Sequence, residues 1–253
     1  MHSSLRQTIY LTCAFLLIAL CATPAICDVY YVAPSGSDSN PGTAALPWLT
    51  IQKAANTLVA GDTVYVKAGT YQERVIPKNS GAVGESITYA AYGNDNVTLD
   101  GSSVFVPRWA GLFEIMDKSY IQVVGFKIKN SSYTGILVED SSHIRIEQNY
   151  TYDTFSSGIG VWNCDHVTIS NNEVELACND GDQECITVAG TDTFEISNNQ
   201  VHHGGPGISG AEGIAAKDGS RNGKVLDNHV HHMNRLGIYV DAWDKHTYNI
   251  EVF

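Results

Sequence analysis

Five short segments of the chain have nearly the same sequence and recur at nearly constant spacing. They begin at residues 135, 158, 185, 213 and 237, and each has Gly or Cys, then Ile, with Val or Ala in the fourth place. Their starts are 23, 27, 28 and 24 residues apart. A period of this length is typical of a solenoid, in which one repeat cannot bury its apolar face alone. Equivalent residues of successive repeats should then lie about 4.8 Å apart.

A second series of alternating segments runs between the first ones, and most of its members end in Asn. Its members are Ile121-Val123, Ile144-Ile146-Asn149, Val167-Ile169-Asn172, Phe194-Ile196-Asn199 and Val225-Asn228. Asn tolerates left-handed backbone angles, and its side chain can hydrogen-bond a neighbouring amide at a turn. Two strand ladders joined by turns predict an all-β fold, a parallel β-helix.

The helical pattern is confined to one place near the N-terminus. Apolar residues at 51, 54, 55 and 58 follow Thr50, a candidate N-cap, and Gly61 lies beyond the end. A helix over residues 50–59 suits a cap on the open end of a solenoid. We therefore expect a cap over about 28–62 and coils over 63–253. Because Phe253 stands in the middle of a strand pattern, we also expect a C-terminally truncated fragment.

Residues 1–27 have the pattern of a secretory signal peptide. Arg6 is followed by an apolar run from Leu11 to Ala22, and the small residues Ala25 and Cys27 precede Asp28. The run is shorter than the ~20 residues of a membrane span. We expect cleavage, a secreted or periplasmic monomer, and no membrane association afterwards. A disulfide between Cys178 and Cys185 is plausible in an oxidising compartment.

The charge of the chain limits its partners. The formal net charge is −12, from 15 basic and 27 acidic residues. Nucleic-acid binding rests on Lys and Arg, so we expect no nucleic-acid partner. An anionic substrate would need local positive charge or a bound cation.

The aligned segments predict an exposed stripe with a candidate active site. Positions two and four of each segment should face inward, and positions three and five outward. Lys217 and Asp241 should then be lateral neighbours beside the small residues Ala189 and Ala215. Lys217 is a candidate base, with a surface ion pair to Asp218 or Asp241 as its structural alternative. Arg235 could reach over the same face as an acid or a carboxylate clamp, although a solvated loop arginine is the simpler reading.

Further candidates surround this stripe. We expect four aromatic side chains to bind substrate by stacking on sugar rings: Trp162, Tyr239, Trp243 and His246. Three acids are candidates for a Ca²⁺ site: Asp182, Glu184 and Glu212. The alternative for these acids is a set of solvated loop carboxylates. His202-His203 and His229, His231 and His232 fall at equivalent turns, as a turn ladder or as part of the groove.

Two parts of the chain resemble known families. Residues 30–71, from Tyr30-Tyr31-Val32-Ala33-Pro34 to Gly69-Thr70-Tyr71, resemble the start of secreted right-handed β-helix proteins, among them the pectate lyase-like enzymes of polysaccharide lyase family nine. The segment Glu212-Gly213-Ile214-Ala215-Ala216-Lys217 is similar to the Glu-to-Lys spacing of chondroitinase-B and alginate-lyase-like enzymes. This resemblance implies that Glu212 helps hold Ca²⁺, Lys217 is the base and Arg235 assists.

Three hypotheses for function follow. The first is a polysaccharide lyase that cleaves a uronate-containing glycan by Ca²⁺-assisted β-elimination, a step whose proton abstraction an epimerase would share. The second is a glycoside hydrolase that uses Asp241 with Asp244 or Asp218 as its carboxylate pair. The third is a non-catalytic glycan-binding β-helix.

Overall fold

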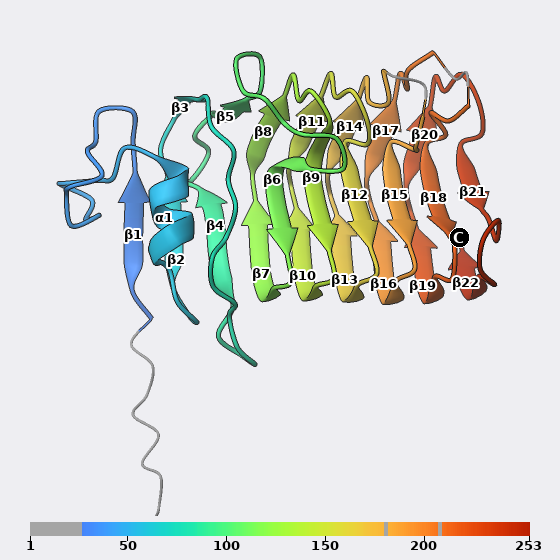
Figure 1. Ribbon diagram of the computed structural model, residues 1–253, viewed down its shortest axis with the longest axis horizontal. Coiled ribbons are helices and arrows are strands. Elements are labelled where there is room, and N and C mark those ends of the chain that lie inside the picture. Colours follow the sequence, from blue (N-terminus) through green and yellow to red (C-terminus); the bar gives the residue numbers. More distant parts are fainter. Residues whose placement is uncertain (1–26, 180–181, 207–208) are drawn as a thin grey trace, which may run out of the picture.

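The strands wind in one direction around a single apolar core. The computed structural model describes residues 27–179, 182–206 and 209–253, so the predicted signal peptide lies almost wholly outside the described residues. Within these ranges the chain forms 22 strands and one helix. Figure 1 shows the strands side by side along the long axis, with β1 (Val29–Val32) at one end and β22 (Tyr248–Val252) at the other.

All named strands pair in parallel, in three sheets of nine, seven and six strands. Sheet A contains β1, β2 (Thr63–Val66), β4 (Ile87–Ala91), β7 (Ser119–Val124), β10 (Ser142–Glu147), β13 (Asp165–Ser170), β16 (Asp192–Ser197), β19 (Arg221–Leu226) and β22. Sheet B contains β3 (Gly69–Tyr71), β5 (Val97–Asp100), β8 (Phe126–Lys129), β11 (Tyr150–Tyr152), β14 (Glu173–Glu175), β17 (Gln200–His202) and β20 (His229–His231). Sheet C contains β6 (Gly111–Met116), β9 (Thr134–Glu139), β12 (Ile159–Trp162), β15 (Ile186–Ala189), β18 (Ile214–Lys217) and β21 (Ile238–Val240). The predicted parallel β-helix is confirmed.

The register of sheet C is the one that the repeated segments predict. Ile159 pairs with Ile186, Ile186 with Ile214, and Ile214 with Ile238. The first three of these isoleucines are fully buried. The residue after each isoleucine faces outward, because successive side chains of a strand point to opposite faces. Sheet C therefore positions equivalent outer residues of successive coils side by side.

The predicted asparagine ladder joins sheet A to sheet B. The side-chain oxygen of Asn172 accepts hydrogen bonds from the backbone N–H and the side-chain amide of Asn149, at 2.9 and 3.1 Å. Asn199 accepts the same pair of bonds from Asn172, and Asn228 from Asn199. Each of the first three side chains also donates to a backbone carbonyl of sheet A. The ladder satisfies buried polar groups at this turn and locks the stacking of the coils.

Sheet B is the part of the architecture that the two-ladder interpretation missed. From β11 onward its strands are three residues long, with one inward residue each, such as Thr151 or Val174. A single inward residue leaves no alternation of apolar and polar positions to detect. The coil therefore has three sides rather than two.

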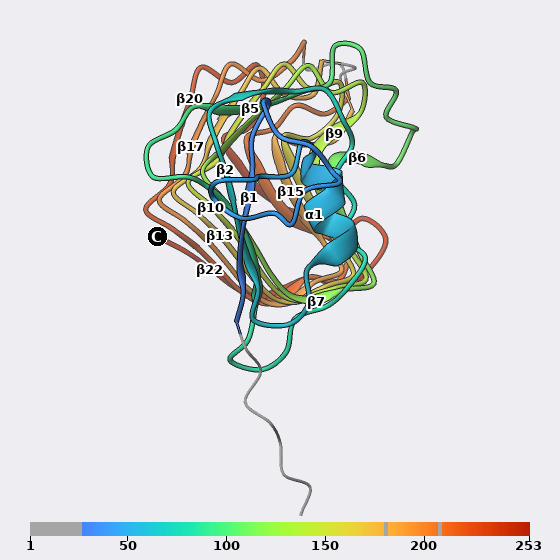
Figure 2. The ribbon, with the colours of Figure 1, turned by 90° about the vertical axis from the view of Figure 1, so that its left-hand side faces the viewer.

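The predicted N-terminal cap is present. The helix α1 (Ile51–Thr57) is shorter than the predicted 50–59, and the Thr50 hydroxyl accepts from the backbone N–H of Lys53 at 3.1 Å. The helix buries Ile51, Ala54 and Ala55 in the core. Figure 2, which looks along the solenoid, shows α1 in front of the coils.

The expected Cys178–Cys185 disulfide is wrong for the described residues. Both cysteines are thiols and both are buried. Their loop leads into sheet C, and its buried ends pack as part of the core. Separately, the described residues contain no helix long and apolar enough to cross a lipid bilayer.

Candidate functional site

The outer face of sheet C carries an ion pair between two neighbouring coils. Lys217 ends β18, and Glu184 stands two residues before β15. The Lys217 ammonium donates to Glu184 Oε1 at 2.8 Å and to Gln183 Oε1 at 3.2 Å. The hydroxyl of Thr187 donates to the other carboxylate oxygen at 2.9 Å. Only 7% of the Glu184 side chain and 14% of the Lys217 side chain are exposed.

A second cation and a second buried carboxylate repeat this arrangement one coil later. Glu212 occupies the position of Glu184, two residues before its strand, and is equally buried. Arg235 precedes β21 and places Nε 3.3 Å from Glu212 Oε1. A buried carboxylate needs a partner, and here each carboxylate has a cation from the following coil. The two carboxylates of adjacent coils are therefore compensated by Lys217 and Arg235.

Tyr239 and Asp241 belong to the next coil of sheet C, in β21 and directly after it. Tyr239 stands opposite Ala215 in the neighbouring strand, and the backbone N–H of Asp241 donates to Ala216 at 3.0 Å. The predicted register beside Lys217 is thus correct, although the Lys217 ammonium is paired with Glu184. The pKa of the Tyr239 phenol is raised, first by partial burial and then by the charge of Asp241. A hydrogen bond to Asp241 and the charges of Glu212 and Glu184 raise it further. The phenol accordingly keeps its proton.

An aromatic pocket adjoins the ion pairs on the N-terminal side. Trp162, at the end of β12, lies over the backbone of Gly160, where an added Cβ would stand 2.1 Å from the indole ring. The ring thus lies against the strand. Other residues that line the pocket include Trp109, Tyr133, Glu139 and Gln183. Since Gln183 also contacts Lys217, the pocket and the ion pairs form one continuous surface.

Sequence reasoning missed Trp109, Tyr133 and Gln183. Tyr133 and Gln183 each stand two residues before the start of a repeated segment, so the repeat alignment contained a signal for them. Trp109 lies in a loop ahead of β6 and has no repeat equivalent. Nothing in the spacing of the segments places it at the pocket.

The three predicted calcium ligands do not come together among the described residues. Glu184 and Glu212 already bind Lys217 and Arg235, and Asp182 is an exposed loop residue that accepts from the hydroxyl of Ser209. These three carboxylates are not within common reach of one ion. As described, these three carboxylates do not converge to supply the six to eight oxygens that Ca²⁺ takes, and the calcium site stays a prediction. Asp180, a further acid of that loop, lies outside the described residues.

The remaining predicted residues lie in the turn between β21 and β22. Trp243 is 86% exposed, and the backbone N–H of Asp244 donates to Asp218 at 3.1 Å. The His246 ring stacks on Tyr248 at 5.3 Å. Asp241 accepts from the backbone N–H of Ala242 at 2.7 Å. The predicted pairing of the Asp241 and Asp244 carboxylates around a glycosidic bond stays a prediction.

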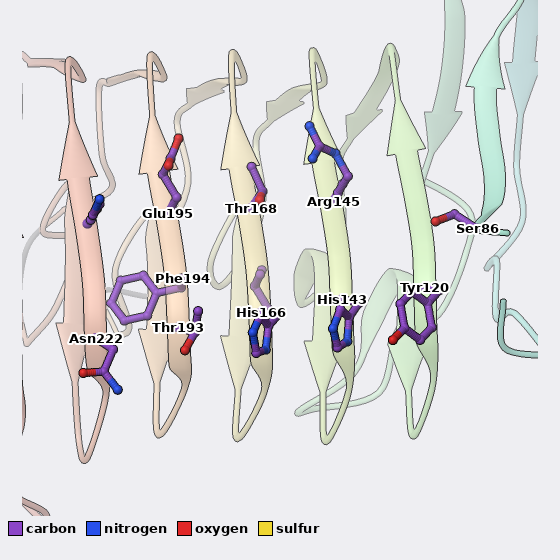
Figure 3. Close-up of a pocket in the computed structure, with 12 residues that line it drawn as sticks. Ser86, Tyr120, His143, Arg145, His166, Thr168, Thr193, Phe194, Glu195 and Asn222 are labelled. Atoms are coloured by element: carbon purple, nitrogen blue, oxygen red, sulfur yellow. The ribbon is translucent and has the colours of Figure 1, made fainter. Parts of the chain in front are cut away.

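A broader hollow occupies a different side of the solenoid, on the outer face of sheet A. Figure 3 shows Tyr120, His143 and His166 in one row across three of its strands. The rings stack on one another, with centroids 4.3 and 4.7 Å apart. Stacked rings cover each other's facing sides, so the middle ring of this row has no free face, whereas a sugar stacks on an aromatic face. We therefore place the candidate site on sheet C, where the indole of Trp162 lies flat.

Comparisons with known proteins agree on the architecture. The chain is 39% identical over 132 residues to the uncharacterized protein YwoF of Bacillus subtilis, covering 49% of this chain and 28% of that one. It is 25% identical over 208 residues to the pectate lyase PEL9 of Emericella nidulans, covering 78% and 45%. The chain thus spans less than half the length of these curated relatives. The crystal structure of an alginate lyase from Paenibacillus sp. FPU-7 superposes with a TM-score of 0.63 at 20% identity, covering 80% of this chain and 72% of the other.

The family model described as "Pel9A-like, right handed beta helix region" matches residues 30–250, which span sheets A, B and C and the cap. The resemblance noted over residues 30–71 therefore extends through nearly all of the described chain. The chain belongs to the Pel9A-like family of right-handed parallel β-helices.

Proposed function

We propose that this chain is a polysaccharide lyase that cleaves a uronate-containing glycan by β-elimination on the outer face of sheet C. The observation that carries the proposal is the pair of cations Lys217 and Arg235. They stand on adjacent coils, each beside a buried carboxylate, next to an aromatic pocket. Arg235, whose side chain is 38% exposed, offers its guanidinium to an anionic sugar on a protein whose net charge is −12. The lyase named among its relatives supports the same class of reaction.

The proposed roles follow from the positions of the side chains. Arg235, whose side chain is 38% exposed, pairs with the uronate carboxylate and so makes the adjacent C5 proton more acidic. Lys217 accepts that proton after its own ammonium proton has passed to Glu184, which is 2.8 Å away. The aromatic pocket holds a neighbouring sugar by stacking on Trp162.

The elimination moves one electron pair into a new double bond and leaves another on the departing oxygen. The C5–H electrons form the C4–C5 double bond, and the C4–O bond to the leaving sugar breaks. The phenol of Tyr239 donates its proton to the leaving oxygen, and the proton held on Glu184 then returns through solvent to the Tyr239 phenolate. The products are a new reducing end and an unsaturated uronate.

The direct test is incubation with a panel of uronans, including polygalacturonate and alginate, while the ultraviolet absorbance of the unsaturated uronate is recorded. Lys217→Ala should lower the rate by about a hundredfold or more, the usual contribution of a general base. Lys224→Ala is the matched control, because Lys224 is an exposed lysine on sheet A. New reducing ends without absorbance would favour a hydrolase, and binding without turnover a glycan-binding protein.

Secretion is part of the proposal. A polymer of this kind lies outside the cell, and the pattern of residues 1–27 fits a cleaved leader. N-terminal sequencing of the exported protein should begin at Asp28. Retention of residues 1–27 on the exported protein would contradict this part of the proposal.

A further inference from the structure

Two histidine pairs occupy equivalent positions on the outer side of sheet B. His202 ends β17 and His231 ends β20, and the two residues pair in register. A second histidine follows each of them, at 203 and 232. The rings stack between coils, with centroids 4.9 Å apart for His202 and His231 and 5.0 Å for His203 and His232. The cluster stands on a different sheet from Lys217, so it is independent of the proposed function.

The backbone brings the two rings of each pair together. Adjacent side chains of a strand normally point to opposite faces. His203 and His232 instead have left-handed backbone angles, with φ of 53° and 52°. As a result the Nδ1 atoms of His202 and His203 are 2.7 Å apart, and those of His231 and His232 are 2.6 Å apart.

A carboxylate completes the first of these pairs. Glu175 stands opposite His202 in the neighbouring coil, and one oxygen of Glu175 and one nitrogen of each of His202 and His203 all lie within 4.8 Å of one another. Among the residues that the structure describes, this is the one group of three such side chains that meets this condition. In the next coil the position of Glu175 is taken by His202, so the His231–His232 pair has an imidazole in place of a carboxylate.

Two neighbouring side chains, Glu173 and Tyr150, orient the candidate ligand residues His202 and Glu175. His202 Nε2 lies 3.1 Å from Glu173 Oε1, which assigns the ring proton to Nε2 and leaves a lone pair on Nδ1. His202 is 6% exposed, so the ring is fixed by its surroundings. The Tyr150 hydroxyl donates to Glu175 Oε2 at 2.6 Å. Partner groups of this kind commonly orient histidine and carboxylate ligands of metal ions.

We propose that Glu175, His202 and His203 bind a divalent transition-metal ion of the zinc type and thereby tie two adjacent coils together. Two imidazole nitrogens and one carboxylate oxygen suit Zn²⁺, with water as the fourth ligand. Two nitrogens on a tetrahedral ion with bonds of 2.0–2.1 Å lie about 3.3 Å apart. A small rotation of the exposed His203 ring therefore opens the 2.7 Å contact far enough to admit the ion.

The test begins with protein that has been treated with a chelator and desalted. Titration with Zn²⁺ in a calorimeter should show one equivalent bound, and the melting temperature should rise by about 5 °C at a hundredfold excess over the dissociation constant. His203→Ala and Glu175→Gln should each weaken binding at least tenfold. The change at His203 removes an exposed side chain and leaves the packed ring of His202 in place.

The controls use the other histidines of the chain. The double variant His143→Ala/His166→Ala removes a stacked pair on sheet A and should bind Zn²⁺ as the unchanged protein does. Ca²⁺ and Mg²⁺ should give no comparable shift in melting temperature, because they prefer oxygen ligands. The proposal is overturned if no Zn²⁺ binds. It is equally overturned if binding survives in Glu175→Gln and His203→Ala but is lost in His231→Ala/His232→Ala.

Discussion

The Nζ atom of Lys217 and the Oε1 atom of Glu184 come from neighbouring coils and meet at 2.8 Å on the outer face of sheet C. The contact is almost wholly shielded from solvent, because only 14% of the Lys217 side chain and 7% of the Glu184 side chain are exposed. It gives the lysine an acceptor for its ammonium proton. In the proposed lyase reaction, this contact lets Glu184 take the ammonium proton of Lys217.

Glu184→Gln should show whether Glu184 acts as a proton acceptor or only as a hydrogen-bonding partner of Lys217. The amide keeps the shape and can still accept a hydrogen bond from Lys217, but it cannot take the proton. We expect kcat to fall about a hundredfold with little change in KM, measured as the rate of unsaturated product. Glu195→Gln, on sheet A, is the control and should leave kcat unchanged. An unaltered kcat in Glu184→Gln would show that the proton goes elsewhere.

Gly160→Ala should displace the indole of Trp162. A Cβ at residue 160 would stand 2.1 Å from the ring, so the ring has to leave the strand. We expect a higher KM and a shifted tryptophan fluorescence spectrum, with the β-sheet circular dichroism preserved. Gly237→Ala adds a methyl group just before β21, at an ordinary contact distance of 3.6 Å from Val230, and should leave the spectrum unchanged. An unchanged KM in Gly160→Ala would remove Trp162 from the substrate site.

Asn172→Ala should lower the free energy of unfolding by about 3 kcal/mol, because it leaves several buried groups without partners. The lost bonds are those from Asn149 to its oxygen and those from its amide to Ile146 and Asn199. Denaturant titration measures the change. Asn96→Ala, at an exposed position, should change the free energy by less than about 0.5 kcal/mol. Equal losses in the two variants would contradict the structural role of the buried ladder.

Glu139 should make stability depend on pH. Desolvation, and then the negative charges of Asp140, Glu114 and Asp117, raise the pKa of this carboxyl in the folded chain. The folded state then holds its proton to higher pH than the unfolded state, so this group lowers stability as pH rises through that window. Glu139→Gln should therefore melt at a higher temperature than the unchanged protein at pH 7 and at the same temperature well below the carboxyl pKa. A difference that persists in acid would assign the effect to packing.

Chelation should leave the proposed lyase reaction intact. Arg235 provides the positive charge for the substrate carboxylate, and the acids expected to bind calcium are paired with side chains. Rates measured before and after treatment with EDTA should agree. A loss that added Ca²⁺ restores would give the neutralising role to a calcium ion, and Arg235→Ala would then have only a small effect on KM.

The fold was largely predictable because its signals repeat. Five copies of one segment set the register of sheet C, and four asparagines marked the turn from sheet A to sheet B. Sheet B gave no such signal, since three residues with one inward side chain have no period. The N-cap at Thr50 could be predicted because a cap depends only on residues that are close in the sequence, here Thr50 and Lys53.

The site was only partly predictable. Register placed Lys217 beside residue 241, but it could not show which way a long side chain turns. The ammonium turns to Glu184, a residue predicted to bind a metal ion. The cysteines show the same limit: a short spacing from Cys178 to Cys185 says nothing of burial, and the core holds both as thiols.

Mass spectrometry of the products from one defined uronate oligosaccharide tests the central claim most directly. Elimination at Lys217 yields a fragment that is lighter by one water than the corresponding hydrolysis fragment, and Lys217→Ala abolishes it. Fragments that carry the added water, or unsaturated fragments formed equally well by Lys217→Ala, would contradict the account.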